Sequence, residues 1–492
     1  MPPWFLCVLW GNWLMGDRSI FLAGVTGVML LLNGCIADQG SSGDELNSLG
    51  SSNSSSPSNT TNSTTSTTSP STPTETGQSD RVTIQTLGLP IVSDDEWDDT
   101  AVRKVLHTFA YGGHATDDQI AAWADMQPDQ AIVEMLTFEE HNLLLSPVTD
   151  SNYDQLDKRD GTLRGLGEFW SSDDPRNGLP VEVRETHRID RWAIDNIWVR
   201  AATSRGLNPF RQKIGLWETN YHMVVNMDAR VFPLQMVAYY DDIMTALESG
   251  MPYHDILTKA ATSAAIANQY GHFGNQFKNG ICFCNEDFAR EYHQLFFGVL
   301  GAYDPDYHET VTIKNTARTL TDMSIERNAA GIETDQISFG LEFHYPGILE
   351  ILETDYWGEN MADRIGQLSQ DEIYHPESLD NLPVMIIGGL ADDNLNDIKI
   401  AQIRSAWASM QPKDLLVFLR AYSISKLFHS EDRIKYLSTI DRHMLLANKV
   451  VLDNEQNYLN VHEIRSYTDE DVRVFRPTHN VFGNQTGMEA AS

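Results

Sequence analysis

One stretch of the chain has no means of folding, and it limits where the core can lie. Residues 39–80 are almost all Ser, Thr, Asn, Gly and Pro, as in SSNSSSPSNTTNSTTSTTSPSTPTET. Such a composition cannot bury enough apolar area to offset chain entropy, so we predict a disordered tether. The core must therefore come from the residues after 80. The chain has 492 residues, 41% of them hydrophobic, which is ample material for a large one.

The segment before the tether predicts export. The apolar run Ile20–Leu32 is short for a membrane-spanning helix but suits the core of a signal peptide. It ends at Leu-Asn-Gly-Cys35, which resembles a bacterial lipobox. That resemblance implies a signal peptide over 1–34, cleavage before Cys35, and acyl chains such as palmitate on the new N-terminal cysteine. Residues 35–80 would then be a lipidated tether, and an uncleaved anchor helix is the less favoured alternative.

The residue after the lipidated cysteine bears on localisation. Ile36 stands where an Asp would retain a lipoprotein at the inner membrane, so we expect an outer-membrane lipoprotein that faces the periplasm or the cell surface. The lipid anchor makes the membrane one partner. The formal net charge of −34 repels phosphate backbones, so we expect no nucleic-acid partner.

The folded part shows mostly helical spacing. Thr116-Asp-Asp-Gln119 is typical of a capping box, and Pro128 and Pro209 suit first helical turns. We predict a mainly α, large multi-helix body with minor β at its N-terminal edge, over 82–92, and a strand-like run at 384–387. The body is divided into lobes at 81–330 and 331–475, and 476–492 is expected to be the start of a truncated segment. Helices are expected at 190–206, from 209 on, and at 234–249, 253–268, 285–300, 308–323, 396–410, 413–428 and 430–447.

The run NEDFARE, from Asn285, gathers several chemistry-bearing side chains. Successive helical residues turn by about 100°, so Glu286 and Glu291 point roughly 140° apart, which suits a pair of catalytic carboxylates poorly. Glu286 and Arg290 are four residues apart and can pair, with His293 on the same stripe. Two explanations follow: a helix capped by Asn285 with a tethered arginine, which we favour, or an arginine aimed at an anionic ligand or a partner helix.

Two further pairs are candidates. Glu218 and His222 lie four apart on a helix with Asn220 between them, a spacing that suits two metal ligands or an acid/base pair and equally a structural pair, which we favour. Cys282 and Cys284 favour a short-range disulfide over free buried thiols, provided that the chain bends between them. No second cysteine pair accompanies them, so no metal site is predicted, and no cofactor motif is present.

These segments together resemble a bacterial family catalogued as domain of unknown function 1800. The specific part is the NEDFARE run at 285–291 followed by Leu295-Phe296, and Ala317-Arg318 continues it at the family's spacing. Looser echoes are Arg103–Phe109, Arg211–His222, and the pairs Phe428-x-Ser430 and Arg433-x-Lys435. The structural or ligand-binding candidates on the matched segments are Asn220, Asn285, Glu291, His293 and Arg318.

The resemblance implies little about the chemistry of this protein. Many members have Trp-His-Asn-His-Phe where this chain has Glu218-Thr-Asn-Tyr-His222, so a His-x-His metal pair is not transferred. The family has no established activity, but its members often look like exported proteins encoded beside a sulfatase-like companion. We therefore expect an envelope-anchored binding or assembly module that works with an exported, sulfatase-like partner. The alternative is an envelope hydrolase that uses Glu218, His222, Glu286 and Arg290 between the helices at 209–223 and 285–298.

Overall fold

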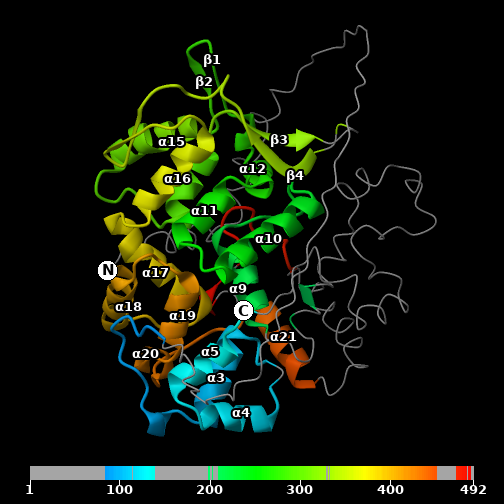
Figure 1. Cartoon of the computed structure of the whole chain (residues 1–492), viewed down its shortest axis with the longest axis vertical. Helices are drawn as coiled ribbons and strands as arrows, with labels where there is room; N and C mark the ends of the chain where they lie inside the picture. The colour runs from blue at the N-terminus through cyan, green and yellow to red at the C-terminus, as the bar shows by residue number, and fades with distance from the viewer. Residues whose placement is uncertain are drawn as a thin grey trace, which may run out of the picture. The chain divides into compact units, whose positions relative to one another are not determined.

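Helices make up most of the described chain, which confirms the mainly α class (Figure 1). The computed structural model describes residues 84–113, 115–138, 198–199, 202, 209–327, 331, 333–450, 473–484 and 486–488. The predictions on the signal peptide, on Cys35 and on the tether lie outside these residues, as does most of the helix expected at 190–206. No helix in the described ranges is both long and apolar enough to cross a membrane.

The first helices are set by local capping. Thr116 forms the predicted capping box, because its hydroxyl accepts from the amide of Gln119 and its own amide donates to the Gln119 side chain. Pro128 occupies the first turn of its helix. Ile91 makes a single antiparallel bridge with Ser425, which is the extent of the β structure over 84–92. The elements are η1 (Asp94–Glu96), α3 (Asp99–Phe109), α4 (Asp117–Ala124) and α5 (Pro128–Met135).

The middle of the chain forms a helical layer around buried Tyr and Ile side chains. α10 falls within one residue of its predicted bounds, whereas the helix expected at 253–268 is interrupted, and Ser263 caps the second part through the amide of Ile266. The elements are α9 (Phe210–Trp217), the π-helical η2 (Glu218–His222), α10 (Pro233–Glu248), α11 (Tyr253–Ala261), α12 (Ala264–Tyr270) and η3 (His272–Gly274).

The helices expected at 285–300 and 308–323 both contain a π-helical turn. Such turns carry one extra residue per turn and occur often at functional sites. Each π-helical segment of the described chain holds a buried histidine: His222 in η2, His293 in η4 and His308 in η5. The elements are α13 (Asp287–Glu291), η4 (Tyr292–Phe296), α14 (Pro305–Tyr307), η5 (His308–Thr312) and α15 (Ile313–Thr319).

In the described part of the chain, three two-stranded antiparallel sheets accompany the helices, and the sequence patterns missed all three. They are β1 (Gln276–Lys278) with β2 (Ile281–Phe283), β3 (Met323–Arg327) with β4 (Glu333–Phe339), and β5 (Leu349–Ile351) with β6 (Thr354–Tyr356). The strand predicted at 384–387 is wrong, because these residues lie inside α17 (Pro376–Leu390), where Ile386 and Ile387 are fully buried. A short apolar run does not distinguish a buried strand from a buried helix.

The last helices pack against the first ones, and the end of the described chain returns to the middle layer. α3, α4 and α5 lie beside α19 and α20 at the end of the molecule opposite the β1–β2 hairpin (Figure 1). Phe475 is fully buried and its carbonyl accepts from the amide of Met227 at 3.0 Å. The elements are α16 (Met361–Glu372), α17, α18 (Asp397–Ser409), α19 (Leu415–Ser423), α20 (Lys426–His429) and α21 (Thr439–Val450).

Candidate functional site

Glu218 and His222 form a buried pair in η2. The His222 Nδ1 lies 2.9 Å from the Glu218 Oε2, and both side chains have 0% exposure. Tyr253 on α11 donates to the other Glu218 oxygen at 2.8 Å. Burial, and then the neighbouring Glu218, raise the pKa of Tyr253 well above its usual value, so this hydroxyl stays protonated. The indole of Trp217 stacks on the imidazole with ring centroids 4.8 Å apart. Every polar atom of the pair is thus engaged from inside the core.

His222 also joins the two helices on which the hydrolase hypothesis depends. Its Nε2 lies 3.2 Å from the backbone carbonyl of Phe296 in η4. The segments 218–222 and 292–296 therefore touch, but through the core. The backbone carbonyl of Asn220 accepts from the amide of Asn484 at 2.9 Å. Its side-chain Oδ1 accepts from the Thr219 hydroxyl at 3.3 Å, and the described residues hold no partner for its buried Nδ2.

The start of the NEDFARE run, residues 285–291, lies closer to the molecular surface than the buried pair of Glu218 and His222. Glu286 is the N-cap residue of α13, where Asn285 had been expected, although the Asn285 side chain does accept from the amide of Asp287 at 2.8 Å. Arg290 pairs with neither Glu286 nor Glu291 and forms its ion pair with Glu309 on η5. The two partners of that pair are 34% and 48% exposed. The arginine is thus tethered, but to a residue nineteen positions away.

Glu291 and His293 turn inward. Burial raises the pKa of Glu291 to about 7, and one of its carboxylate oxygens has no hydrogen-bond partner among the described residues. His293 lies 2.5 Å from Glu372 through Nδ1 and 2.7 Å from Thr316 through Nε2. Burial lowers the pKa of His293 to about 3 and raises that of Glu372 well above its usual value. The pair is therefore held as a neutral imidazole against a protonated carboxyl group.

The four residues of the hydrolase hypothesis do not surround one cleft. Glu218 and His222 are sealed in the core, whereas Glu286 is exposed and Arg290 lies in a half-exposed ion pair. Within the described part of the chain, no group of three or more His, Cys, Asp or Glu side chains could hold a metal ion. Arg318 donates to Asn315 at 2.6 Å within its own helix.

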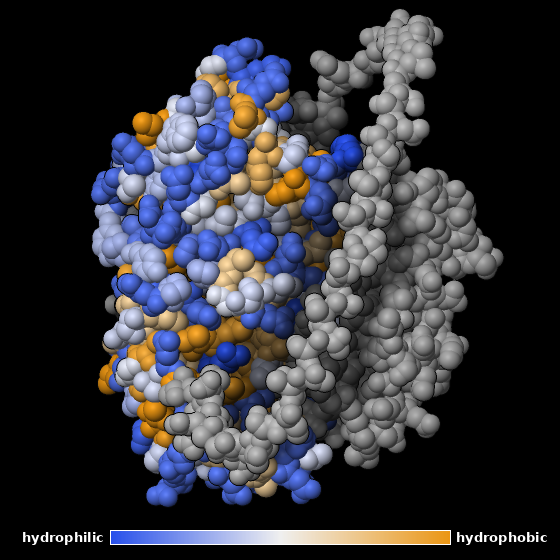
Figure 2. All heavy atoms as spheres, in the orientation of Figure 1, coloured by the Kyte–Doolittle hydropathy of each residue, from blue (hydrophilic) through white to orange (hydrophobic). Residues whose placement is uncertain are grey.

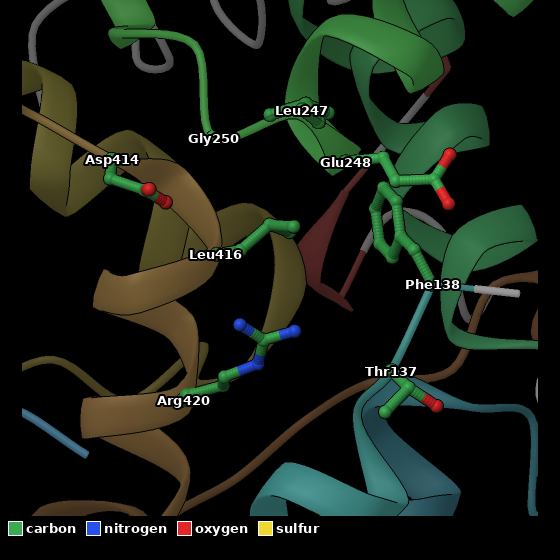
Figure 3. A pocket seen from close by; sticks show the side chains of 8 residues that line it. All are labelled: Thr137, Phe138, Leu247, Glu248, Gly250, Asp414, Leu416 and Arg420. Atoms are coloured by element: carbon green, nitrogen blue, oxygen red, sulfur yellow. The ribbon is translucent and has the colours of Figure 1, made fainter. Parts of the chain in front are cut away.

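Two cavities of the described part of the chain have none of these candidates in their lining. One, of about 260 Å³, is lined by Phe138, Leu247, Leu416 and the charged groups Glu248, Asp414 and Arg420 (Figure 3). The other, of about 480 Å³, includes Lys104, Lys426 and His429. Burial lowers the pKa of Lys104 to about 8.

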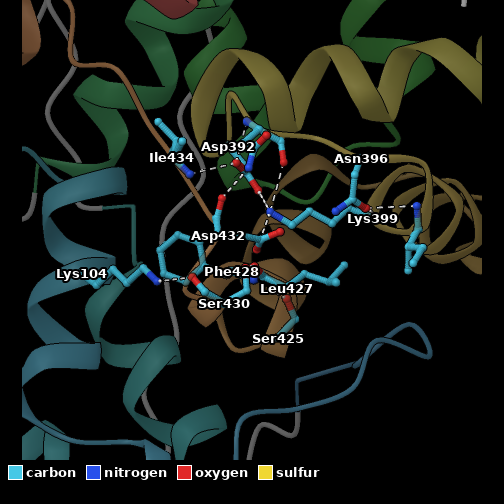
Figure 4. Close-up of polar contacts among 12 residues, drawn as sticks. Lys104, Asp392, Asn396, Lys399, Ser425, Leu427, Phe428, Ser430, Asp432 and Ile434 are labelled. Carbon is cyan, nitrogen blue, oxygen red and sulfur yellow. Dashed lines mark hydrogen bonds and ion pairs between the residues drawn. The ribbon is translucent and has the colours of Figure 1, made fainter. Parts of the chain in front are cut away.

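The second cavity borders a charged network that ties α3 to the C-terminal helices. Lys399 donates to Asp392 at 2.9 Å and pairs with Asp432 at 3.0 Å, while Lys104 donates to the carbonyl of Ser430 at 3.4 Å (Figure 4). Arg433 donates to Thr108 on α3 at 2.6 Å. The segment 428–435 therefore has a packing role, because the backbone carbonyl of Ser430 and the side chain of Arg433 bind residues of α3 that lie more than 300 positions earlier in the chain.

The sequence patterns did not predict the β1–β2 hairpin, but they singled out Cys282 within it and Cys284 just after it. Cys282 and Cys284 are linked by a disulfide, with Cα atoms 5.3 Å apart. Opposite residues are Gln276 with Phe283, Phe277 with Cys282, and Lys278 with Ile281. Because side chains alternate along a strand, Ile281 and Phe283 share the outer face, where they are 57% and 61% exposed, and the cysteines share the inner, half-buried face.

The hairpin also has one open edge. The amide of Phe277 donates outward, at 2.7 Å, to the carbonyl of Phe343. In an antiparallel pair, the backbone N–H and C=O groups of two directly opposite residues either bond to each other or both point away from the pair. Phe277 lies opposite Cys282 and points its amide away, so the N–H and C=O of Cys282 point to the far edge of β2. No strand or backbone hydrogen bond from the described residues occupies that edge. An asparagine-glycine turn at 279–280, both with positive φ, fixes this register.

Comparison with known proteins gives one match. The family model described as "Protein of unknown function (DUF1800)" matches residues 104–440. No curated protein and no solved structure matches the chain.

Proposed function

The chain belongs to the DUF1800 family, and from this premise we propose that it is an envelope-anchored binding module that receives an extended segment of an exported partner protein at the open edge of β2. The observation that carries the proposal is the outward-facing backbone of Cys282, flanked by the exposed side chains of Ile281 and Phe283. An exposed strand edge is a template for one more strand. Strand addition gives affinity through main-chain hydrogen bonds and specificity through alternate side chains.

The surroundings of the edge support this proposal. Figure 2 shows the end of the molecule that carries the β1–β2 hairpin, at the top of the view, as a mosaic of hydrophilic and apolar residues, as expected for a reversible contact. The hairpin is short, so the side chains must contribute much of the binding energy. A partner with an extended, apolar segment fits, and the sulfatase-like protein suggested by the family resemblance is one candidate.

The lipid anchor at Cys35 and an outer-membrane location belong to the same proposal. They rest on the lipobox-like sequence and on the tether, which would leave the folded part free to reach a partner. The hydrolase alternative has less support, because two of its four residues are sealed and the other two form no cleft with them.

Site-specific photo-crosslinking tests the binding proposal. A photoreactive residue replaces Ile281 in the full chain in its native host, and a matched variant carries it at Ile398 on α18, which is 70% exposed. We expect one discrete protein adduct at 281 and none at 398, with the crosslinked peptide of the partner mapped to an extended segment. Equal labelling at both positions, or adducts only to lipid, would overturn the proposal.

A further inference from the structure

The disulfide at the end of β2 does not join two distant segments of the chain. It joins the central residue of β2 to the residue that follows the strand, with only Phe283 between them, so it does not link β2 to β1. The hairpin is already closed by its own ladder and its two-residue turn. A bridge that closes so small a ring constrains the unfolded chain little, and stabilisation grows with the size of the ring. The presence of this disulfide is therefore better explained by its redox chemistry than by a contribution to folding.

The bridge lies where another polypeptide can reach it. Both cysteines are half-buried rather than sealed, and Cys282 presents its backbone to the open edge. A strand added at that edge would run directly beside the sulfur pair. Ile281 is exposed next to it and can hold an apolar side chain of the incoming segment. A disulfide that is at least partly exposed can exchange with a thiol, whereas structural bridges resist reduction by glutathione.

We propose that the Cys282–Cys284 disulfide is a thiol oxidant for an extended polypeptide that carries two cysteines. A thiolate of that polypeptide attacks one sulfur, the S–S bond breaks, and the other sulfur leaves as a thiolate. A second thiolate of the polypeptide then attacks its own sulfur in the mixed disulfide and releases the remaining cysteine. The polypeptide gains one disulfide, Cys282 and Cys284 become thiols, and the two protons pass from the polypeptide's thiols to them. One chain transfers one disulfide. This activity goes beyond the proposed partner binding, and its test needs no partner.

The test uses the purified full-length chain under native conditions with a reduced, extended peptide that carries two cysteines between apolar residues. Peptide disulfide and the two protein thiols are followed by alkylation and mass spectrometry. We expect oxidation at least about tenfold faster than with equimolar oxidised glutathione, because docking at the strand edge raises the effective concentration of the peptide thiols. The double variant Cys282→Ser/Cys284→Ser, altered only on the half-buried face of the hairpin, should be inactive. A rate no higher than that of glutathione, or activity that survives in the double variant, overturns the proposal.

A second variant separates peptide capture from sulfur chemistry. Ile281→Ser lies outside the disulfide ring, and Ile398→Ser on α18 is its matched control. We expect Ile281→Ser to slow peptide oxidation several-fold and to leave the reaction with a small thiol unchanged, and we expect Ile398→Ser to change neither. If the chain reacts with small thiols but never oxidises the peptide, the oxidant role is wrong, whatever the photo-crosslinking result at 281.

Discussion

Replacing Glu218 by alanine distinguishes a structural pair from a catalytic one. The substitution removes the partner of the His222 Nδ1 at 2.9 Å and of the Tyr253 hydroxyl at 2.8 Å, both of them inside the core. Leaving a buried polar group without its hydrogen-bond partner costs about 1–3 kcal/mol, and here two groups lose theirs. The Tyr253 hydroxyl lies 3.2 Å from the same imidazole nitrogen and can bond to it in the variant, which offsets part of the loss. We therefore expect the free energy of unfolding to fall by roughly 3 kcal/mol.

The assay is urea denaturation, followed by far-UV circular dichroism and by tryptophan fluorescence so that coincident curves establish a two-state transition. Arg290→Ala is the matched control, because its ion pair with Glu309 is 34% and 48% exposed, and surface pairs contribute only about 0–1 kcal/mol. If Glu218→Ala left stability unchanged or raised it, the pair would be a strained functional site and our structural explanation would be refuted.

The remaining predictions concern packing, pH and the anchor. Gly215→Ala should destabilise by about 1–3 kcal/mol in urea, because its Cβ would lie 2.4 Å from a tyrosine ring, whereas Gly366→Ala, with nothing within 4 Å, should be neutral or stabilising. Burial raises the pKa of Glu291 from 4.5 to about 7, so the native state binds this proton more tightly than the unfolded state. The free energy of unfolding should therefore fall as the pH rises from 4.5 to about 7. Glu291→Gln should flatten this pH dependence in urea titrations at pH 5 and 7. An alkyne-tagged palmitate fed to the host should label the chain, Cys35→Ser should abolish the label, and Cys7→Ser should keep it.

Local patterns predicted helices well where the helix was regular. α10 was placed within one residue and Thr116 caps its helix as expected, because capping and period depend on residues a few positions apart. The helix expected at 285–300 changes to a π-helical turn at Tyr292, which a period of 3.6 residues does not anticipate. Two of the hairpins were missed because their strands have only three residues each, too few to show an alternation. β4 has seven residues, but nearly all of them are half-buried, so it shows no clear alternation either.

In the candidate site, too, the sequence predicted only the contacts between residues a few positions apart. The spacing of Glu218 and His222 predicted their contact, because four helical residues bring two side chains together. The partner of Arg290 is nineteen residues away and that of His293 seventy-nine, so no local pattern could identify them. The open edge of β2 was equally out of reach of the sequence, since it follows from the outward hydrogen bond between Phe277 and Phe343.

The most direct test of the account is hydrogen exchange at the amide of Cys282. In the free chain this amide points to an edge that no described residue covers, so it should exchange fast. In the complex with the partner captured at 281, strand addition should slow its exchange at least about tenfold, while amides of α18 around Ile398 remain unchanged. An unchanged exchange rate at Cys282 in the complex would contradict binding at the β2 edge.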